Sequence, residues 1–230
     1  MAKRDDMKAP WQQAAEASAG GDAEQCAAAA SLLVMRDTPD GAELLIVRRA
    51  AGLAFGGGAL VFPGGRVEPE DWRGPADDPE AAARHAAVRE TREETGIACA
   101  VETLHPFARW RAPPGLARRF DTRFFLAPAP GAADPRADGV ETDEAFWARP
   151  AALLAAAEAR PGLLLFPTFC LLARLAALPD YARARADAEA WPRPVITPRV
   201  EQRADGAWLA IDQGLGYPRT ARPVAAQRRA

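Results

Sequence analysis

The segment 59–97 limits what this chain can fold into more than any other part of the sequence. It begins with an apolar run, "ALVFP", which is typical of a buried strand, and continues with Gly64 and Gly65. Two adjacent glycines permit a tight turn with backbone groups open to close approach by a ligand. The segment ends in a helix predicted over 79–95. A glycine turn is common at strand ends, so its meaning depends on the helix that follows it.

The ends of this helix are marked by capping residues. Asp78 is expected to cap the first turn, Pro79 suits the first helical position, and Gly96 is expected to close the C-terminus. These residues therefore predict where the helix over 79–95 begins and ends.

Three glutamates, Glu90, Glu93 and Glu94, lie near the end of the helix in the stretch "RETREETGI". Residues three and four apart share a helix face, so the three carboxylates converge and repel one another. Arg89 precedes Glu93 by four residues and is expected to hold that carboxylate in place. Two interpretations stay open at this point: a solvated acidic face with interspersed arginines, or a metal site.

A metal site made of carboxylates favours a hard cation, Mg²⁺ or Mn²⁺, over zinc. Magnesium is usually held by a few carboxylates together with water and substrate phosphates. The metal interpretation therefore predicts a phosphorylated substrate. A carbonyl at Gly64 or Gly65 is a further expected ligand.

The composition excludes several other classes of protein. A net charge of −2 argues against a general nucleic-acid or membrane-surface partner. Three separated cysteines and two histidines show no spacing for a disulfide framework or a histidine metal site. No apolar run reaches the length of a membrane span, and the N-terminus has no apolar signal core. We expect a cytoplasmic protein.

The remaining elements predict a mixed sheet covered by helices. Residues 1–25 are expected to form a loose arm, and 26–230 a single domain with a C-terminal helical extension. The fold class predicted is α+β. Expected strands are 27–37, 43–49, 59–63, 101–112 and 118–130, followed by a short strand within 139–150. Expected helices are 151–159, 166–178 and 181–191, before a hairpin over 195–212 turned at Ala204–Gly206.

The glycine turn and the acidic helix together resemble the Nudix hydrolase box, G-x5-E-x7-R-E-U-x-E-E-x-G-U, where U is aliphatic. Its second half matches in register over Arg89, Glu90, Glu93, Glu94, Gly96 and Ile97, with Thr91 in place of the first U. Gly65 matches the opening glycine. This resemblance implies an α/β/α sandwich with a mixed sheet and extra C-terminal helices. It also implies Mg²⁺ (or Mn²⁺) held by Glu90 and Glu94, with Glu93 as a ligand or base.

The box is interrupted in this sequence. The family places its arginine 14 positions after the glycine, whereas Arg89 follows Gly65 by 24 positions. The excess of ten lies in "WRGPADDPEA", which has the composition of a loop, and loop insertion costs little closure entropy. The box acid is either Asp71, by counting from the glycine, or Glu80, by proximity to the helix. Asp71 is preferred.

Members of the family with inserted boxes include coenzyme A diphosphatases, and this chain is similar to them in "LLIVRRAAGLAFGGGALVFPGG" and "RRFDTRFFLA". The arginine that the coenzyme A pattern would place near Leu53 is absent. Substitutes able to bind a phosphate are Arg48, Arg49, Arg111, Arg118 and Arg119, each of which has a surface-charge alternative. We expect cleavage of coenzyme A or acyl-coenzyme A to 3′,5′-ADP and 4′-phosphopantetheine.

Other possibilities remain open from the sequence. ADP-ribose, a nucleotide sugar or a dinucleotide is an alternative substrate, and a ligand-sensing module without turnover is an alternative function. Glu141 and Glu144 precede Trp147 in a region from which the family often takes an additional ligand or base, and Glu144 is preferred. The C-terminal helices are expected either to cover the distal part of the substrate or to form a homodimer face.

Overall fold

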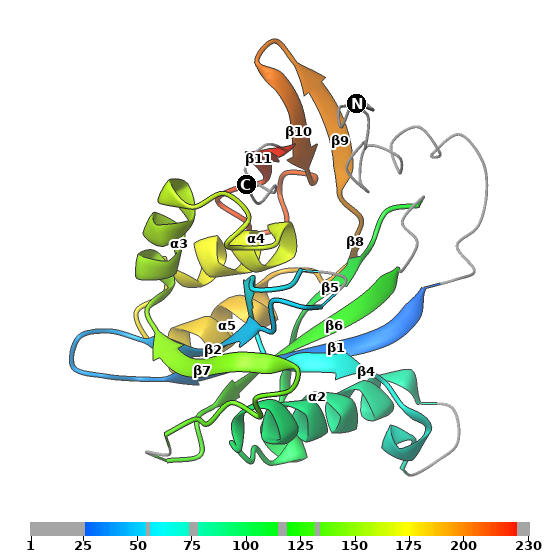
Figure 1. The fold of residues 1–230 in the computed structure, drawn as a ribbon, viewed down its shortest axis with the longest axis vertical. Helices are drawn as coiled ribbons and strands as arrows, with labels where there is room; N and C mark the ends of the chain where they lie inside the picture. Colours follow the sequence, from blue (N-terminus) through cyan, green and yellow to red (C-terminus); the bar gives the residue numbers. More distant parts are fainter. Residues whose placement is uncertain (1–25, 54–55, 74–77, 115–118, 132–133, 225–230) are drawn as a thin grey trace, which may run out of the picture.

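A mixed sheet with helices on both faces forms the centre of the computed structural model (Figure 1). The structure describes residues 26–53, 56–73, 78–114, 119–131 and 134–224. The predicted arm 1–25, Arg118 and part of the inserted loop fall outside the described residues. Within the described part, no helix is long and apolar enough to cross a membrane.

The main sheet has eight strands in the order β3-β2-β1-β6-β5-β8, with β4 paired to β1 and β7 paired to β2. β1 runs parallel to β6 and antiparallel to β2 and β4, so the sheet is mixed, as predicted. The strands are β1 (Ala27–Arg36), β2 (Glu43–Arg49), β3 (Leu60–Val61), β4 (Gly64–Arg66), β5 (His105–Arg111), β6 (Phe120–Pro128), β7 (Thr142–Ala148) and β8 (Val195–Ile196).

Alternating residues of the central strands bury one face of the sheet under α2 (Pro79–Thr95) and the other under three C-terminal helices. In β1, Leu32 and Val34 face the alanines of α2, while Leu33 and Met35 face the opposite core. That second core includes α3 (Pro150–Ala159), α4 (Phe166–Leu175) and α5 (Tyr181–Ala190). The α/β/α layering predicted from the sequence is confirmed (Figure 1).

A small second sheet follows the helices. It is built from β9 (Arg199–Arg203), β10 (Gly206–Ala210) and β11 (Ala221–Pro223), and the β9–β10 hairpin turns at the position predicted. Leu209 of β10 and Val224 lie in the same core cluster as the C-terminal helices. The helical extension and the small sheet therefore share one core with the main sheet.

Two predicted elements differ in the structure. Gly64 and Gly65 form no turn; they begin the short strand β4, which pairs with Ala30 and Ser31 of β1. The strand predicted over 101–112 begins only at His105, because Val101–Thr103 forms a short 3-10 helix. At β4 the pairing with β1, which local sequence does not encode, decides the backbone conformation.

The shared core predicts that the helical extension and the sheet unfold together. Leu171 is fully buried in α4, so Leu171→Ala is expected to lower the free energy of unfolding by about 2–5 kcal/mol through lost contacts and a cavity. Urea unfolding followed by circular dichroism and by tryptophan fluorescence should give one coincident transition. Val195→Ala, at a 37% exposed residue, is the control and should change stability by less than about 0.5 kcal/mol. Two separate transitions would show that the extension is an independent unit.

Candidate functional site

The two glycines of β4 bring the backbone against the acidic end of α2. Gly64 has φ +153°, and a Cβ atom there would overlap the Ala30 carbonyl of β1. The Gly64 N–H donates to Glu94 Oε2 at 2.9 Å. A Cβ atom at Gly65 would overlap the carboxylate of Glu90. The glycines are therefore required for close approach, and they place two glutamates of the helix at one edge of the strand.

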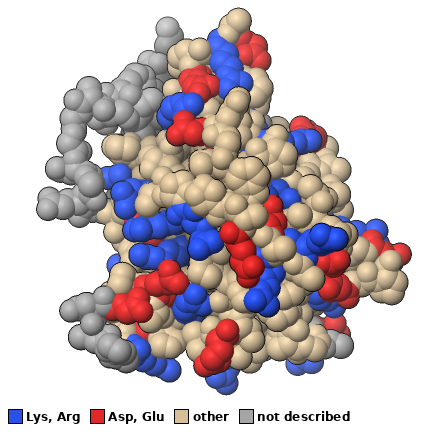
Figure 2. All heavy atoms as spheres, turned by 180° about the vertical axis from the view of Figure 1, so that it is seen from behind, with Lys and Arg blue, Asp and Glu red and all other residues tan. Residues whose placement is uncertain are grey.

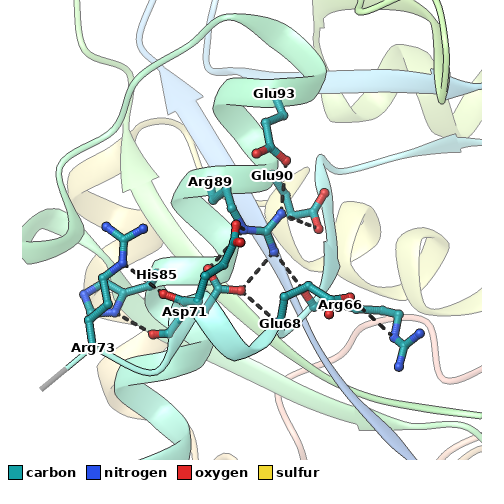
Figure 3. A network of polar contacts seen from close by, with 9 residues as sticks. Arg66, Glu68, Asp71, Arg73, His85, Arg89, Glu90 and Glu93 are labelled. Atoms are coloured by element: carbon teal, nitrogen blue, oxygen red, sulfur yellow. Dashed lines mark hydrogen bonds and ion pairs between the residues drawn. The ribbon is translucent and has the colours of Figure 1, made fainter. Parts of the chain in front are cut away.

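Arg89 organises the residues around this edge (Figure 3). Its guanidinium donates to both carboxylate oxygens of Asp71, at 3.0 and 2.9 Å, and to the Arg66 carbonyl at 3.0 Å. The same side chain donates to Glu90 Oε1 and to Glu93 Oε2, each at 3.0 Å. The expected contact between Arg89 and Glu93 is confirmed. One side chain thereby ties the helix to β4 and to the segment after it.

Of the two candidates for the box acid, Asp71 is the one that contacts Arg89. It ends a short 3-10 helix, η2 (Pro69–Asp71), and only 1% of the residue is exposed. The Glu68 N–H donates to its carboxylate, and His85 of α2 lies 2.9 Å from its carbonyl oxygen (Figure 3). The other candidate, Glu80, pairs with Arg84 at 2.9 Å. Asp71, and not Glu80, is therefore the acid that pairs with the arginine of the box.

The two groups of this pair stabilise each other's charge. Burial alone raises the pKa of Asp71, but the hydrogen bonds from Arg89 and Glu68 and the charge of Arg89 outweigh it and hold the pKa below its usual value. The hydrogen bond to Asp71 raises the pKa of Arg89 further. Both groups are therefore charged at neutral pH, and the pair acts as a fixed support for the helix.

The pKa values of Glu90 and Glu94 are shifted in the opposite direction from that of Asp71: both are raised. Burial raises the pKa of Glu94 to about 8, and the nearby charges of Glu90 and Glu141 add to this effect. The Gly64 N–H and the charge of Arg49 oppose it only in part. Burial also raises the pKa of Glu90, although Arg89 lies beside it. The buried carboxylate of Glu94 and the partly buried carboxylate of Glu90 provide a place where a bound cation would be stabilised.

A third acid reaches this place from the loop before β7. Glu141 contributes to the raised pKa of both Glu90 and Glu94, whereas Glu144, the residue preferred from the sequence, pairs with Arg48 at 3.0 Å. Strand pairing explains the difference, because Glu144 lies directly opposite Arg48 of β2. The acid of this loop that approaches the site is Glu141.

Two residues that the sequence reasoning missed hold this loop in position. Asp138 Oδ1 accepts hydrogen bonds from the backbone of Val140, Glu141 and Thr142. The buried Thr142 hydroxyl contacts Asp138 and donates to the Glu94 carbonyl at 3.2 Å. The stretch "DGVET", an Asp before Gly with Thr four positions later, is a local signal that would have indicated this turn.

The oxygen ligands at this place suit a magnesium ion, whose coordination shell does not have to be made of side chains alone. Among the described residues, no three His, Cys, Asp or Glu side chains lie close enough together to form such a site alone. Glu90 and Glu94 beside the backbone of Gly64 and Gly65 provide two carboxylates and neighbouring carbonyl oxygens. Magnesium commonly takes one or two carboxylates and completes its shell with water and phosphate oxygens. Glu93 is 57% exposed and is held by Arg89.

The predicted substrate-binding arginines are divided between two places. Arg49 lies near Glu94, as its effect on that pKa shows, and Arg48 is held by Glu144. Arg111 pairs with Asp121 at 2.7 Å on β5 and β6, and Arg119 donates to the Ala112 carbonyl. The structure therefore brings Arg49, but not Arg111, to the carboxylates.

Comparison with known proteins agrees with this geometry. The family model of the NUDIX domain matches residues 27–166, which is more than half of the chain. A protein named probable nudix hydrolase C6G9.05, from Schizosaccharomyces pombe, is 40% identical over 69 residues, which cover 30% of this chain. The match spans about a fifth (21%) of that relative. A crystal structure of a NUDIX hydrolase from Alicyclobacillus acidocaldarius has a TM-score of 0.65 and 27% identity, covering 72% of this chain and 97% of that one.

The contact between Gly65 and Glu90 predicts that a single methyl group disrupts the site. Gly65→Ala is expected to displace the Glu90 carboxylate and to weaken Mg²⁺ or Mn²⁺ binding by about tenfold or more. Isothermal titration with each ion measures this affinity. Gly52→Ala is the matched control, because a Cβ atom there meets nothing within 4 Å. Equal metal affinity in both variants would refute the placement of the ion beside β4.

The raised pKa of Glu94 predicts a pH dependence of stability in metal-free protein. Its folded-state pKa of about 8 lies above the ordinary 4.5, so the folded state keeps a proton that the unfolded chain has lost. This contribution is fully present below pH 4.5 and is lost as the pH rises toward 8. Relative to Glu94→Gln, the wild type should lose about 1–4 kcal/mol over this range in urea unfolding with a chelator. A pH-independent difference between the two proteins would contradict the prediction.

Proposed function

The chain belongs to the NUDIX domain family, and from this premise we propose that it is a metal-dependent hydrolase of a phosphoric anhydride. The observation that carries the proposal is the pair of carboxylates held against Gly64 and Gly65, the buried Glu94 and the partly buried Glu90. A pure binding module has no need for clustered carboxylates, because like charges close together are unfavourable in a fold. The proposed substrate is a small molecule linked through a nucleoside diphosphate.

Mg²⁺ or Mn²⁺ is the proposed cofactor, with Glu90, Glu94 and the Gly65 carbonyl as the residues that would hold it and Glu93 as a further ligand through water. When bound, such an ion polarises phosphoryl oxygens and lowers the pKa of coordinated water. Arg89 keeps Glu90 and Glu93 oriented, since it is itself fixed by two hydrogen bonds to Asp71. Asp71 acts only through Arg89 and is a positioning residue.

We propose Glu141 as the proton acceptor for the attacking water. It is the loop acid whose charge affects both Glu90 and Glu94, and the turn built by Asp138 and Thr142 holds its backbone. Glu144 was the candidate from the sequence, and its ion pair with Arg48 lowers its availability as a base. Paired substitutions at the two positions separate these assignments.

Coenzyme A or acyl-coenzyme A is the proposed substrate, giving 3′,5′-ADP and 4′-phosphopantetheine or its acyl form. Arg49, beside Glu94, is placed to contact the oxygens of a diphosphate bound at the carboxylates. Arg48, Arg111 and Arg119 are candidates for further phosphate contacts, and Gly64 would present backbone to the ligand. ADP-ribose, nucleotide sugars and dinucleotides are the competing substrates.

A substrate panel tests this function. With Mg²⁺, the wild type should release phosphomonoesters from coenzyme A faster than from ADP-ribose, a nucleotide sugar or a dinucleotide. Glu94→Gln should lower kcat by about 10²–10⁴-fold, because a neutral side chain neither holds the ion nor offsets its charge. Turnover of ADP-ribose but not coenzyme A would replace the proposed substrate, and turnover of no diphosphate would refute the hydrolase.

The proton acceptor is tested in the same assay. Glu141→Gln should lower kcat by about 10²–10³-fold, because the attacking water loses its proton acceptor. Glu144→Gln is the matched variant. It makes the same change three positions later, in β7, and should have a smaller effect on kcat. The reverse order of the two effects would return the assignment to Glu144.

A further inference from the structure

We propose that three arginines on β5 and β6 form a second site, one that binds a phosphate monoester. Arg109, Arg111 and Arg123 lie on the α2 face of the sheet, around the side chain of Asp121. On the face opposite to that of Figure 1, basic side chains gather beside acidic ones (Figure 2). Nothing in the hydrolase site described above uses Arg109 or Arg123.

The register of the two strands sets these side chains in a square. Arg109 lies directly opposite Arg123, and Arg111 lies directly opposite Asp121. Residues opposite each other or two apart along a strand share a face, so all four side chains lie together. The square holds three positive charges and one negative charge. Two like charges directly opposite each other destabilise a sheet, so the pair Arg109–Arg123 is unfavourable by itself.

Asp121 is already paired with two of the three arginines and makes no hydrogen bond or ion pair with the third, Arg123. Arg109 donates to both carboxylate oxygens, at 2.7 and 2.9 Å, and Arg111 donates twice to Oδ2, at 3.0 and 2.7 Å. These bonds hold the pKa of Asp121 below its usual value despite its burial. The aspartate thus orients two guanidinium groups as fixed donors.

The guanidinium of Arg123 has no hydrogen bond or ion pair with another residue in the described part of the chain. Burial and the charge of Arg109 lower its pKa, and the charge of Asp121 opposes them only in part. The other acids that affect it are engaged elsewhere: Asp78 accepts two N–H groups at the start of α2, and Glu80 pairs with Arg84. An uncompensated guanidinium beside two oriented ones matches a dianionic, tetrahedral oxyanion.

The square lies in line with the hydrolase site. Gly65, Ala30, Arg123 and Arg109 are successive partners across β4, β1, β6 and β5. At about 4.8 Å per strand, Arg123 is about 10 Å from Gly65 and Arg109 about 14 Å. The Arg109 and Arg111 side chains are 33% and 29% exposed, so solvent reaches them. The phosphate is either a remote group of the hydrolase substrate or a separate ligand; only the first case rests on the proposed function.

Thermal unfolding of the full chain with a chelator, in inorganic phosphate or in chloride of equal ionic strength, tests the site without turnover. The wild type should show a higher Tm in phosphate, and Arg123→Gln should lose most of that rise. Without phosphate, Arg123→Gln should melt no lower than the wild type, because a like-charge contact is removed. Arg203→Gln, which removes one charge from the distant β9, is the control and should keep the rise. Glu94→Gln should keep it too.

Several outcomes would overturn the proposal. These are no phosphate response in the wild type, a full response in Arg123→Gln, or a response lost in Glu94→Gln, which would place the phosphate at the carboxylates. If Arg123→Gln melts at a lower temperature than the wild type in chloride, the phosphate response of Arg123→Lys decides whether the site exists. This variant keeps the charge, so a partial response supports the site and no response overturns it.

Affinities of 3′,5′-ADP and 5′-AMP, measured by titration in chelator, identify the source of the phosphate. If Arg123→Gln weakens binding of 3′,5′-ADP about tenfold and leaves 5′-AMP unchanged, the site takes a second phosphate of the substrate. If it changes neither affinity but removes the response to inorganic phosphate, the site takes a separate phosphate ligand. Both results support the site, and the second holds whether or not the chain hydrolyses coenzyme A.

Discussion

The missing side chains at Gly64 and Gly65 are the constraint on which the rest of the structure depends. Any Cβ at Gly64 would overlap the backbone of β1, and any Cβ at Gly65 would overlap the carboxylate of Glu90. Because both positions are bare, β4 pairs with β1 on one side and accepts the end of α2 on the other. Ser31 of β1 strengthens the junction through its hydrogen bond to the Pro63 carbonyl. The carboxylates of the helix consequently lie against peptide groups, where ions and phosphates bind in proteins.

The surroundings of Asp71 and Glu94 shift the pKa values of these two acids in opposite directions. Asp71 is buried, but Arg89 and a backbone N–H compensate its charge, so it remains ionised and supports the fold. Glu94 is also buried, yet it receives one backbone hydrogen bond and faces two further acids, which favours its proton in the absence of a cation. The structure therefore separates a permanent ion pair from a carboxylate available for metal. This division of roles, rather than the number of acids, distinguishes a metal centre from a charged helix face.

The sequence predicted the helix and its ends because capping and i, i+4 contacts are local. Asp78, Gly96 and the Arg89–Glu93 contact all appear where expected. It missed the strand at Gly64, since that conformation depends on β1, about thirty residues earlier. It preferred Glu144 to Glu141, because only the register of β7 against β2 shows that Arg48 occupies Glu144. The choice of Asp71 over Glu80 agreed with the structure, which supports Asp71 through Glu68 and His85.

The interrupted box is tolerated because both sides of the insertion are anchored independently. Asp71 is fixed before it by η2 and Arg89, and within it Asp78 caps α2, whose first three residues are the last residues of the insertion. Lengthening a loop between two anchored points costs little closure entropy. The helix then acts as a rigid spacer of about 25 Å, given 17 residues at about 1.5 Å each. Its C-terminal half carries the carboxylates proposed to bind metal, and the charges of Asp78 and Glu80 at its start act on Arg123. One helix thus connects the proposed hydrolase site to the proposed phosphate site.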